Sequence, residues 1–260
     1  MNKENQAKII ELVKQAKPLI LQEMAHEKVT EKGVADYVTN VDVAVQNYLK
    51  EALGKEFPDI ALIAEEKENL GLNSRKSYWI LDPIDGTTNL IRDYHLSAVS
   101  LGLYENGKIT FGVVYNPFTE ELFYGAKGEG AYLNGTPIHV SDQQEFKDAV
   151  VSFGSSPYEK NRAKELFPVF YNIFMNCADF RRTGSAALDL CYVACGRQHA
   201  YLEQNLKPWD YSGATVILRE AGGTITDWEN KEPPYLENSD ILACVPQFRE
   251  ILQRLIKKQV

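Results

Sequence analysis

The segment at residues 79–89, WILDPIDGTTN, contains two carboxylates three positions apart, Asp82 and Asp85, directly after an apolar run. A glycine, two hydroxyls and an amide follow them. Hard cations prefer carboxylate and hydroxyl oxygens, and a glycine lets backbone N–H groups approach a phosphate closely. An Asp-Pro turn followed by an Asp-Gly turn is the simpler interpretation, but the complete string is more specific than either dipeptide. The segment therefore predicts a site for a divalent metal and a phosphate group.

Three other acidic clusters stand at the ends of expected elements. Glu65 and Glu66 follow a short apolar strand, Asp42 stands near the start of a helix, and Asp210 stands at the start of another. Each cluster alone has an ordinary explanation, as a surface pair or as a helix cap. Together with the 79–89 segment they favour a shared metal site. Because no histidine or cysteine joins these oxygen ligands, Mg²⁺ is favoured over zinc.

The elements that must position these residues can be predicted from apolar periodicity. In the first half, steps of three and four predict helices at residues 3–27 and 42–53, with Gly33 ending the first stretch. Short apolar runs predict strands at 60–64 and 78–81, separated by a polar turn at 65–76. An antiparallel meander is expected with strands at 98–104, 109–115 and 121–124, and a loop-rich stretch then extends to Ser141.

The second half alternates strands and helices. We expect strands at 149–153, 200–202, 224–226 and 241–243, and helices at 160–175, 185–195, 209–221 and 247–257. Strands mixed with helices, together with the antiparallel portion, predict an α+β or α/β layered sandwich. The expected boundary gives an N-terminal α+β lobe at 1–145 with most metal ligands, and a C-terminal α/β lobe at 146–260 with Asp210 and the specificity residues.

Composition limits the classes of partner. The chain of 260 residues has a formal net charge of -8 and no long basic run, so we expect no direct binding to nucleic acid or to a membrane. The 4 cysteines form no C-x-x-C pair and are expected to be buried thiols. The N-terminus lacks an apolar signal region, and no apolar run is long enough to span a bilayer. We therefore expect a cytoplasmic protein.

At this point the chain resembles the inositol monophosphatase family, within the lithium-sensitive, magnesium-dependent phosphatase superfamily. The motifs that carry the resemblance run in family order along most of the chain: Asp36-Tyr37-Val38-Thr39 with Asp42, Ala64-Glu65-Glu66, the segment from Asp82 to Asn89, the segment from Gly128 to Gly135, Gly184-Ser185-Ala186-Ala187, Trp209-Asp210, and Glu220-Ala221-Gly222-Gly223. Ala64 stands where the family usually has glycine, and Leu90 replaces a common phenylalanine. Neither departure removes a ligand. The loop Glu31-Lys32-Gly33 aligns uncertainly, so no role is carried onto it.

The resemblance implies how the metals would be held. One Mg²⁺ would be bound by Glu65, Asp82 and the backbone carbonyl of Ile84. A second would be bound by Asp82, Asp85 and Asp210, so that Asp82 bridges the pair. The family also has room for a third, weaker Mg²⁺ near Glu65.

The family's catalytic chemistry would be an in-line attack of a metal-activated water, oriented by Thr87 with Asp42 and supported by Glu65. The substrate phosphate would contact Asp85 and the backbone N–H groups of Gly86, Thr87 and Thr88. The alcohol portion would contact Ser185, Ala186 and Glu203. Trp209, Tyr201 and Tyr211 are expected in the core and receive no site role.

The expected function is a Mg²⁺-dependent phosphomonoesterase acting on myo-inositol monophosphate or a related small polyol phosphate, in a homodimer. Related enzymes leave alternatives open: the 2'-phosphate of NADP(H), fructose bisphosphate, or 3'-phosphoadenosine 5'-phosphate as substrate. A regulatory interaction protein of the extragenic suppressor type is the alternative from another class.

Overall fold

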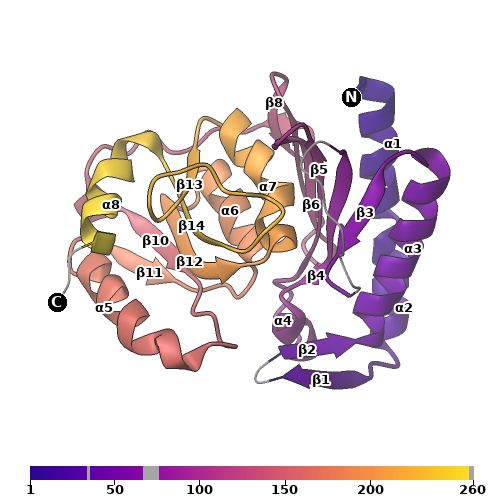
Figure 1. Cartoon of the computed structure of the whole chain (residues 1–260), viewed down its shortest axis with the longest axis horizontal. Coiled ribbons are helices and arrows are strands. Elements are labelled where there is room, and N and C mark those ends of the chain that lie inside the picture. Colours follow the sequence, from indigo (N-terminus) through magenta and orange to yellow (C-terminus); the bar gives the residue numbers. More distant parts are fainter. Residues whose placement is uncertain (34–35, 67–75, 258–260) are drawn as a thin grey trace.

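Layers of helices and two β-sheets follow one another in alternation along the long axis of the molecule (Figure 1). The computed structural model describes residues 1–33, 36–66 and 76–257, with only the backbone described at Asp36. The larger sheet has 7 strands and the smaller has 5. The layers run from the N-terminal helices through the larger sheet, a central helix pair and the smaller sheet to an outer helix pair (Figure 1). The predicted layered sandwich is confirmed.

The N-terminal helical layer consists of α1 (Lys3–Lys14), α2 (Ala16–Met24) and α3 (Asn40–Glu56). The single helix expected at 3–27 is wrong, because the chain breaks at Gln15. Pro18 has no N–H to donate to the carbonyl of residue 14, so a continuous helix would lose that bond. The third helix starts two residues earlier than expected, and its N-cap is Thr39.

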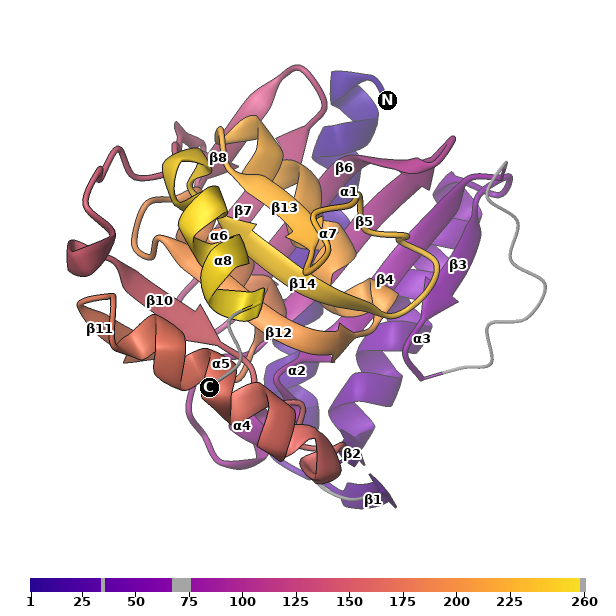
Figure 2. The ribbon, with the colours of Figure 1, turned by 60° about the vertical axis from the view of Figure 1, so that its left-hand side comes forward.

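A β-hairpin that the sequence did not predict lies between α2 and α3. Its strands are β1 (Val29–Gly33) and β2 (Asp36–Thr39), which pair antiparallel. All five residues of β1 are exposed, so the strand lacks the apolar alternation that would have revealed it. The hairpin projects from the edge of the molecule near α3 (Figure 2).

The larger sheet contains the predicted meander. Its strands, in spatial order, are β3 (Ala61–Ala64), β4 (Tyr78–Asp85), β5 (Ala98–Glu105), β6 (Lys108–Asn116), β7 (Glu121–Ala126), β8 (Gly130–Leu133) and β9 (Thr136–Pro137). The last two occupy the stretch that was expected to be loop. The first two strands are parallel and the remaining neighbours are antiparallel. The polar turn expected at 65–76 lies mostly outside the described residues.

The smaller sheet has the spatial order β11 (Asp179–Arg181), β10 (Val150–Phe153), β12 (Ala200–Leu206), β14 (Ser239–Cys244) and β13 (Thr224–Asp227). Strand β11 was not predicted, because it is only three residues long. Helices α5 (Ala163–Phe174) and α8 (Arg249–Lys257) contact each other on the outer side of this sheet (Figure 1). Short 3-10 turns precede both helices, so each begins later than expected.

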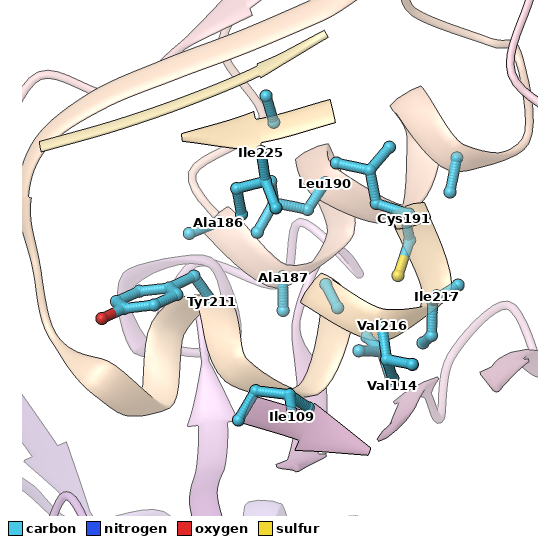
Figure 3. Close-up of a cluster of buried hydrophobic side chains, with 14 of the residues drawn as sticks. Ile109, Val114, Ala186, Ala187, Leu190, Cys191, Tyr211, Val216, Ile217 and Ile225 are labelled. Atoms are coloured by element: carbon cyan, nitrogen blue, oxygen red, sulfur yellow. The ribbon is translucent and has the colours of Figure 1, made fainter. Parts of the chain in front are cut away.

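The central layer consists of α6 (Ala186–Ala194) and α7 (Pro208–Glu220). Their apolar side chains form a buried cluster that includes Leu190, Val216 and residues of both sheets, such as Val114 and Ile225 (Figure 3). Helix α7 therefore packs on the larger sheet, although it belongs to the proposed C-terminal lobe. We keep the division near residue 145 as a proposal about chain organisation. Across the described helices, none is long and apolar enough to cross a membrane.

Candidate functional site

A cavity of about 450 Å³ opens where the end of β4, the start of α6, strand β12 and the start of α7 converge. Every predicted site residue except Asp42 lines it: Glu65, Asp82, Ile84, Asp85, Gly86, Thr87, Thr88, Ser185, Ala186, Glu203 and Asp210. Asp42 lies directly behind Thr87, to which it is hydrogen-bonded. Residues from opposite ends of the chain thus share one polar cavity.

Asp82 and Asp85 lie within β4 rather than beyond it. All eight residues of this strand are buried, and its pairing with β5 shifts register between the two carboxylates. The N–H of Ile84 donates to Asp82 Oδ1 at 3.0 Å. Ser185 Oγ and the N–H of Ala187 both donate to Asp85 Oδ2, at 2.5 and 2.8 Å. One oxygen of each carboxylate is therefore fixed by the protein.

Asp42 connects the start of α3 to Thr87. It is the third residue of the helix and completes a capping box with Thr39, which is the N-cap, so the alternative explanation of Asp42 as the N-cap does not hold. Thr39 donates to Asp42 Oδ2 through its N–H and its hydroxyl, at 2.8 and 2.6 Å. The other oxygen, Oδ1, lies 3.2 Å from Thr87 Oγ1. Burial raises the pKa of Asp42 to about 6, although the Thr39 hydrogen bonds oppose this shift.

Glu65 follows β3 and faces the unexpected hairpin. Lys32 Nζ lies 3.2 Å from Glu65 Oε1 and 2.7 Å from Glu66 Oε1. Burial raises the pKa of Glu65 to about 7, and the Lys32 ammonium partly opposes that increase. Lys32 received no role from the sequence, and its ammonium group partly compensates the charge at this edge of the acidic cluster.

Asp210 enters the site from the first turn of α7. The N–H of Lys207 donates to Asp210 Oδ2 at 2.8 Å, which completes a capping contact. The helix can approach the larger sheet because glycines face it: a Cβ on Gly112 would lie 2.0 Å from the carbonyl oxygen of Gly213. This close packing brings Asp210 near Asp85. Burial raises the pKa of Asp210, and the Asp85 charge raises it further.

The donor set fits a hard divalent cation. Burial is the largest cause of the raised pKa at Asp82, followed by repulsion from Glu65, Asp85 and Asp210. A bound cation would offset both the desolvation and the repulsion. Among residues 1–33, 36–66 and 76–257, no group of three acidic, histidine or cysteine side chains lies close enough together to hold a metal ion as the side chains stand.

Gly86 begins the short helix α4 (Thr87–Ile91) in a left-handed conformation, with φ of 90°. A Cβ at this position would lie 2.9 Å from the carbonyl oxygen of Leu96 and 3.2 Å from that of Gly184. Asn89 ties the same turn to the C-terminal lobe, because its Nδ2 donates to the carbonyls of Leu96 and Thr183 at 2.7 and 2.9 Å. Only glycine fits at the start of α4.

The opposite wall of the cavity is built around Glu203. Tyr201 Oη donates to Glu203 Oε2 at 2.5 Å, and the N–H of Ser156 donates to Oε1 at 3.0 Å. A Cβ on Gly154 would lie 1.7 Å from Glu203 Oε2, so the carboxylate lies directly over that glycine. Burial raises the pKa of Glu203, and nearby Arg182 partly opposes this. Glu203 is therefore a constrained carboxylate rather than a surface residue.

Sequence reasoning missed several residues of the cavity or its edge, among them Lys32, Gly154, Arg182 and Tyr201. Tyr201 was expected only in the core, and it is 1% exposed, yet its hydroxyl contacts Glu203. Alternation along β12 could have found it, since positions two apart on a strand share a face. The other three depend on packing between distant segments.

All 4 cysteines are free, with Cys191 and Cys244 buried and the others half-buried.

Asp189→Asn is expected to stabilise the protein at neutral pH. Burial raises the pKa of Asp189 to about 7, above its value near 4 in the unfolded chain. The protonated Asp189 side chain therefore makes its full contribution to the stability of the wild type below about pH 4. That contribution is lost as the pH rises through about 7. Asparagine has no charge to bury, so the difference in unfolding free energy should grow to about 4 kcal/mol by pH 8.

Urea unfolding of both proteins at pH 4 and pH 8, without added metal, would measure this difference. Asp142→Asn, which changes an exposed acid elsewhere, is the matched control. A difference between Asp189→Asn and wild type that is the same at both pH values would contradict the prediction.

Comparisons with known proteins agree with this fold. A model of the inositol monophosphatase family matches residues 1–260. A Pasteurella multocida protein named Nus factor SuhB is 38% identical over 228 residues, which are 87% of this chain and 85% of that protein. The crystal structure of extragenic suppressor protein suhB from Bartonella henselae has a TM-score of 0.91 and 32% identity, covering 99% of this chain and 100% of that chain. The crystal structure of an IMPase/NADP phosphatase complexed with Mg²⁺ and phosphate has a TM-score of 0.91 and 25% identity, covering 99% and 96%.

Proposed function

Because the chain belongs to the inositol monophosphatase family, we propose that it is a Mg²⁺-dependent phosphomonoesterase acting on myo-inositol monophosphate or a related small polyol phosphate. The observation that carries this proposal is the convergence of Glu65, Asp82, Asp85 and Asp210 on one cavity. Asp82 and Asp85 are buried and the other two are half-buried. Four carboxylates, with no histidine or cysteine among the described residues that line the cavity, suit Mg²⁺. Two cations are proposed, with a third, weaker one near Glu65.

The proposed ligands divide as the family resemblance implies. Glu65, Asp82 and the carbonyl of Ile84 would hold one cation, and Asp82, Asp85 and Asp210 would hold the other. This is supported by the fixed oxygens of Asp82 and Asp85, which leave the second oxygen of each carboxylate for a cation. Bound Mg²⁺ would lower the pKa of a water and neutralise charge that develops on the phosphoryl group.

Thr87 is proposed to orient the attacking water. Its hydroxyl proton can go to Asp42 Oδ1 or to the carbonyl of Ile84, each 3.2 Å away. Either bond leaves a lone pair of Oγ1 free to accept a hydrogen bond from a water in the cavity. The N–H groups of Gly86, Thr87 and Thr88 would donate to the phosphate oxygens, because the backbone turns there into α4.

The alcohol portion of the substrate would contact the Glu203 wall, with Ser185 and Ala186 beside it. The carboxylate of Glu203 is held by Tyr201 and Ser156, and such a fixed acceptor can select for a substrate hydroxyl. Hydrolysis of NADP(H), fructose bisphosphate or phosphoadenosine phosphate at the same metals remains the alternative within this reaction class.

Removal of divalent metal is expected to abolish phosphate release. After dialysis against EDTA, activity should fall to background, and added Mg²⁺ should restore it. We would measure released phosphate from myo-inositol 1-phosphate, NADP, fructose 1,6-bisphosphate and 3'-phosphoadenosine 5'-phosphate, with and without Li⁺. Full activity after chelation, or no release from any of the four with Mg²⁺ present, would refute the proposed function.

A regulatory role of the extragenic suppressor type is the second candidate. It is favoured by the 38% identity to a protein named Nus factor SuhB. We propose that such a role would use protein contacts rather than direct nucleic-acid binding, because the net charge is -8. Capture of RNA polymerase by the immobilised chain, together with no turnover on the substrate panel, would favour this candidate. Light scattering would test the homodimer that we also propose.

A further inference from the structure

Asp85 is the proposed metal ligand that depends most on the other lobe. Both hydrogen bonds to its Oδ2 come from the turn at the start of α6, from residues 100 and 102 positions further along the chain. The carboxylate can keep Oδ1 toward a cation only while that turn stays in place. Whatever fixes the turn therefore fixes the direction of the ligand.

Thr183 holds the turn together. Its hydroxyl accepts a hydrogen bond from the N–H of Ser185 at 3.2 Å and donates to Asp189 Oδ2 at 2.8 Å. Its carbonyl accepts from Asn89 Nδ2 at 2.9 Å, on the phosphate side of the site. Thr183 thus links the 183–187 turn to α4 and to the side chain of Asp189.

Asp189 connects the 183–187 turn to the smaller sheet. Gln198 Nε2 donates to Asp189 Oδ1 at 3.2 Å, and Gln198 Oε1 accepts from the hydroxyl of Ser152 in β10. Asp189 is 2% exposed and lies in the first turn of α6, where a carboxylate is favoured by the helix dipole. Its two oxygens are committed to Thr183 and Gln198, so it borders the cavity with both oxygens engaged by the protein.

We propose that Asp189 is a positioning residue for Asp85, acting through Thr183 and the 183–187 turn to aim the Asp85 carboxylate at its cation. The inference rests on the proposed metal site and adds a residue to its support. Nothing in the proposal brings Asp189 into contact with substrate or metal. Residues that orient a metal ligand from outside the first shell commonly change metal affinity by about 10–100-fold when removed.

Asp189→Ala is expected to weaken Mg²⁺ binding at least about tenfold. The change leaves Thr183 and Gln198 without their acceptor, so the turn can shift and Asp85 can rotate. Asp189→Asn should bind nearly as wild type, because its Oδ1 can accept from Gln198 and its Nδ2 can donate to Thr183. Thr183 Oγ1 could then donate to the carbonyl of Ser185, 3.2 Å away.

Isothermal titration calorimetry with Mg²⁺ alone would measure binding independently of turnover, and thermal unfolding would measure stability. Val151→Ala, a buried apolar change in β10, is the control for a merely structural loss. It should lower the melting temperature and leave the Mg²⁺ dissociation constant unchanged. Unchanged Mg²⁺ affinity in Asp189→Ala, or equal weakening in Asp189→Asn and Asp189→Ala, would overturn the positioning role. If the wild type binds no Mg²⁺, the proposed function fails instead.

Discussion

Asp85→Asn is expected to lower turnover about a hundredfold while the protein stays folded. The change removes the negative charge from a proposed metal ligand, and a cation at a reacting phosphoryl group contributes about 3 kcal/mol or more of transition-state stabilisation. The amide oxygen can still accept from Ser185 and Ala187, so the contact with the α6 turn is kept. Burial raises the pKa of Asp85 to about 6, so the neutral variant should be at least as stable without metal.

Phosphate release at increasing Mg²⁺, together with thermal unfolding in EDTA, would measure both effects. Asp142→Asn removes the same charge from an exposed position and should keep normal activity. Near-normal turnover of Asp85→Asn at saturating Mg²⁺ would exclude Asp85 as a ligand. A lower melting temperature in EDTA would instead show that the variant has lost its packing.

Gly112→Ala is expected to destabilise the protein by about 3 kcal/mol, at the upper end of overpacking effects. The added methyl would lie 2.0 Å from the carbonyl oxygen of Gly213 and 3.0 Å from Val216 Cγ1. A backbone carbonyl cannot rotate away as a side chain can, so α7 would have to move off β6. Asp210 is on the same helix, so the folded fraction should also bind Mg²⁺ less tightly.

Urea unfolding would give the loss of stability, and Gly54→Ala provides the matched control. A Cβ on Gly54, within α3, meets no atom within 4 Å, so alanine there should raise stability by about 1 kcal/mol. A Gly112→Ala variant with an unchanged unfolding midpoint would show that α7 packs less closely than described.

The sequence singled out the carboxylates that the structure brings together in the cavity, but it did not reveal the walls around them. The carboxylates at 82, 85 and 210 stand beside strong local signals, namely a buried strand and a helix start. Lys32 and Gly154 have no such signal. Their importance arises only because the hairpin reaches Glu65 and because Glu203 lies over the glycine that follows β10. Contacts of this kind are set by tertiary packing, which periodicity does not encode.

The fold was predicted at the level of layers and missed in its short elements. The meander of β5 to β7 was clear because long apolar runs are separated by an Asn-Gly turn and a proline break. Strands β8 and β9 have only four and two residues, and glycines and polar residues flank them, so the stretch resembles a loop. The break at Gln15 could have been predicted from Pro18.

The ligands of the proposed metal site come from segments that span more than half of the chain, from Glu65 to Asp210. Contacts between such distant positions form late in folding, because their loop-closure entropy is large. A chain that the ribosome has synthesised only as far as the end of the larger sheet would contain Glu65, Asp82 and Asp85 but not Asp210. Recovery of Mg²⁺ binding during refolding should therefore coincide with the docking of α7 on the larger sheet. The rate of that recovery would measure how fast this long-range contact forms.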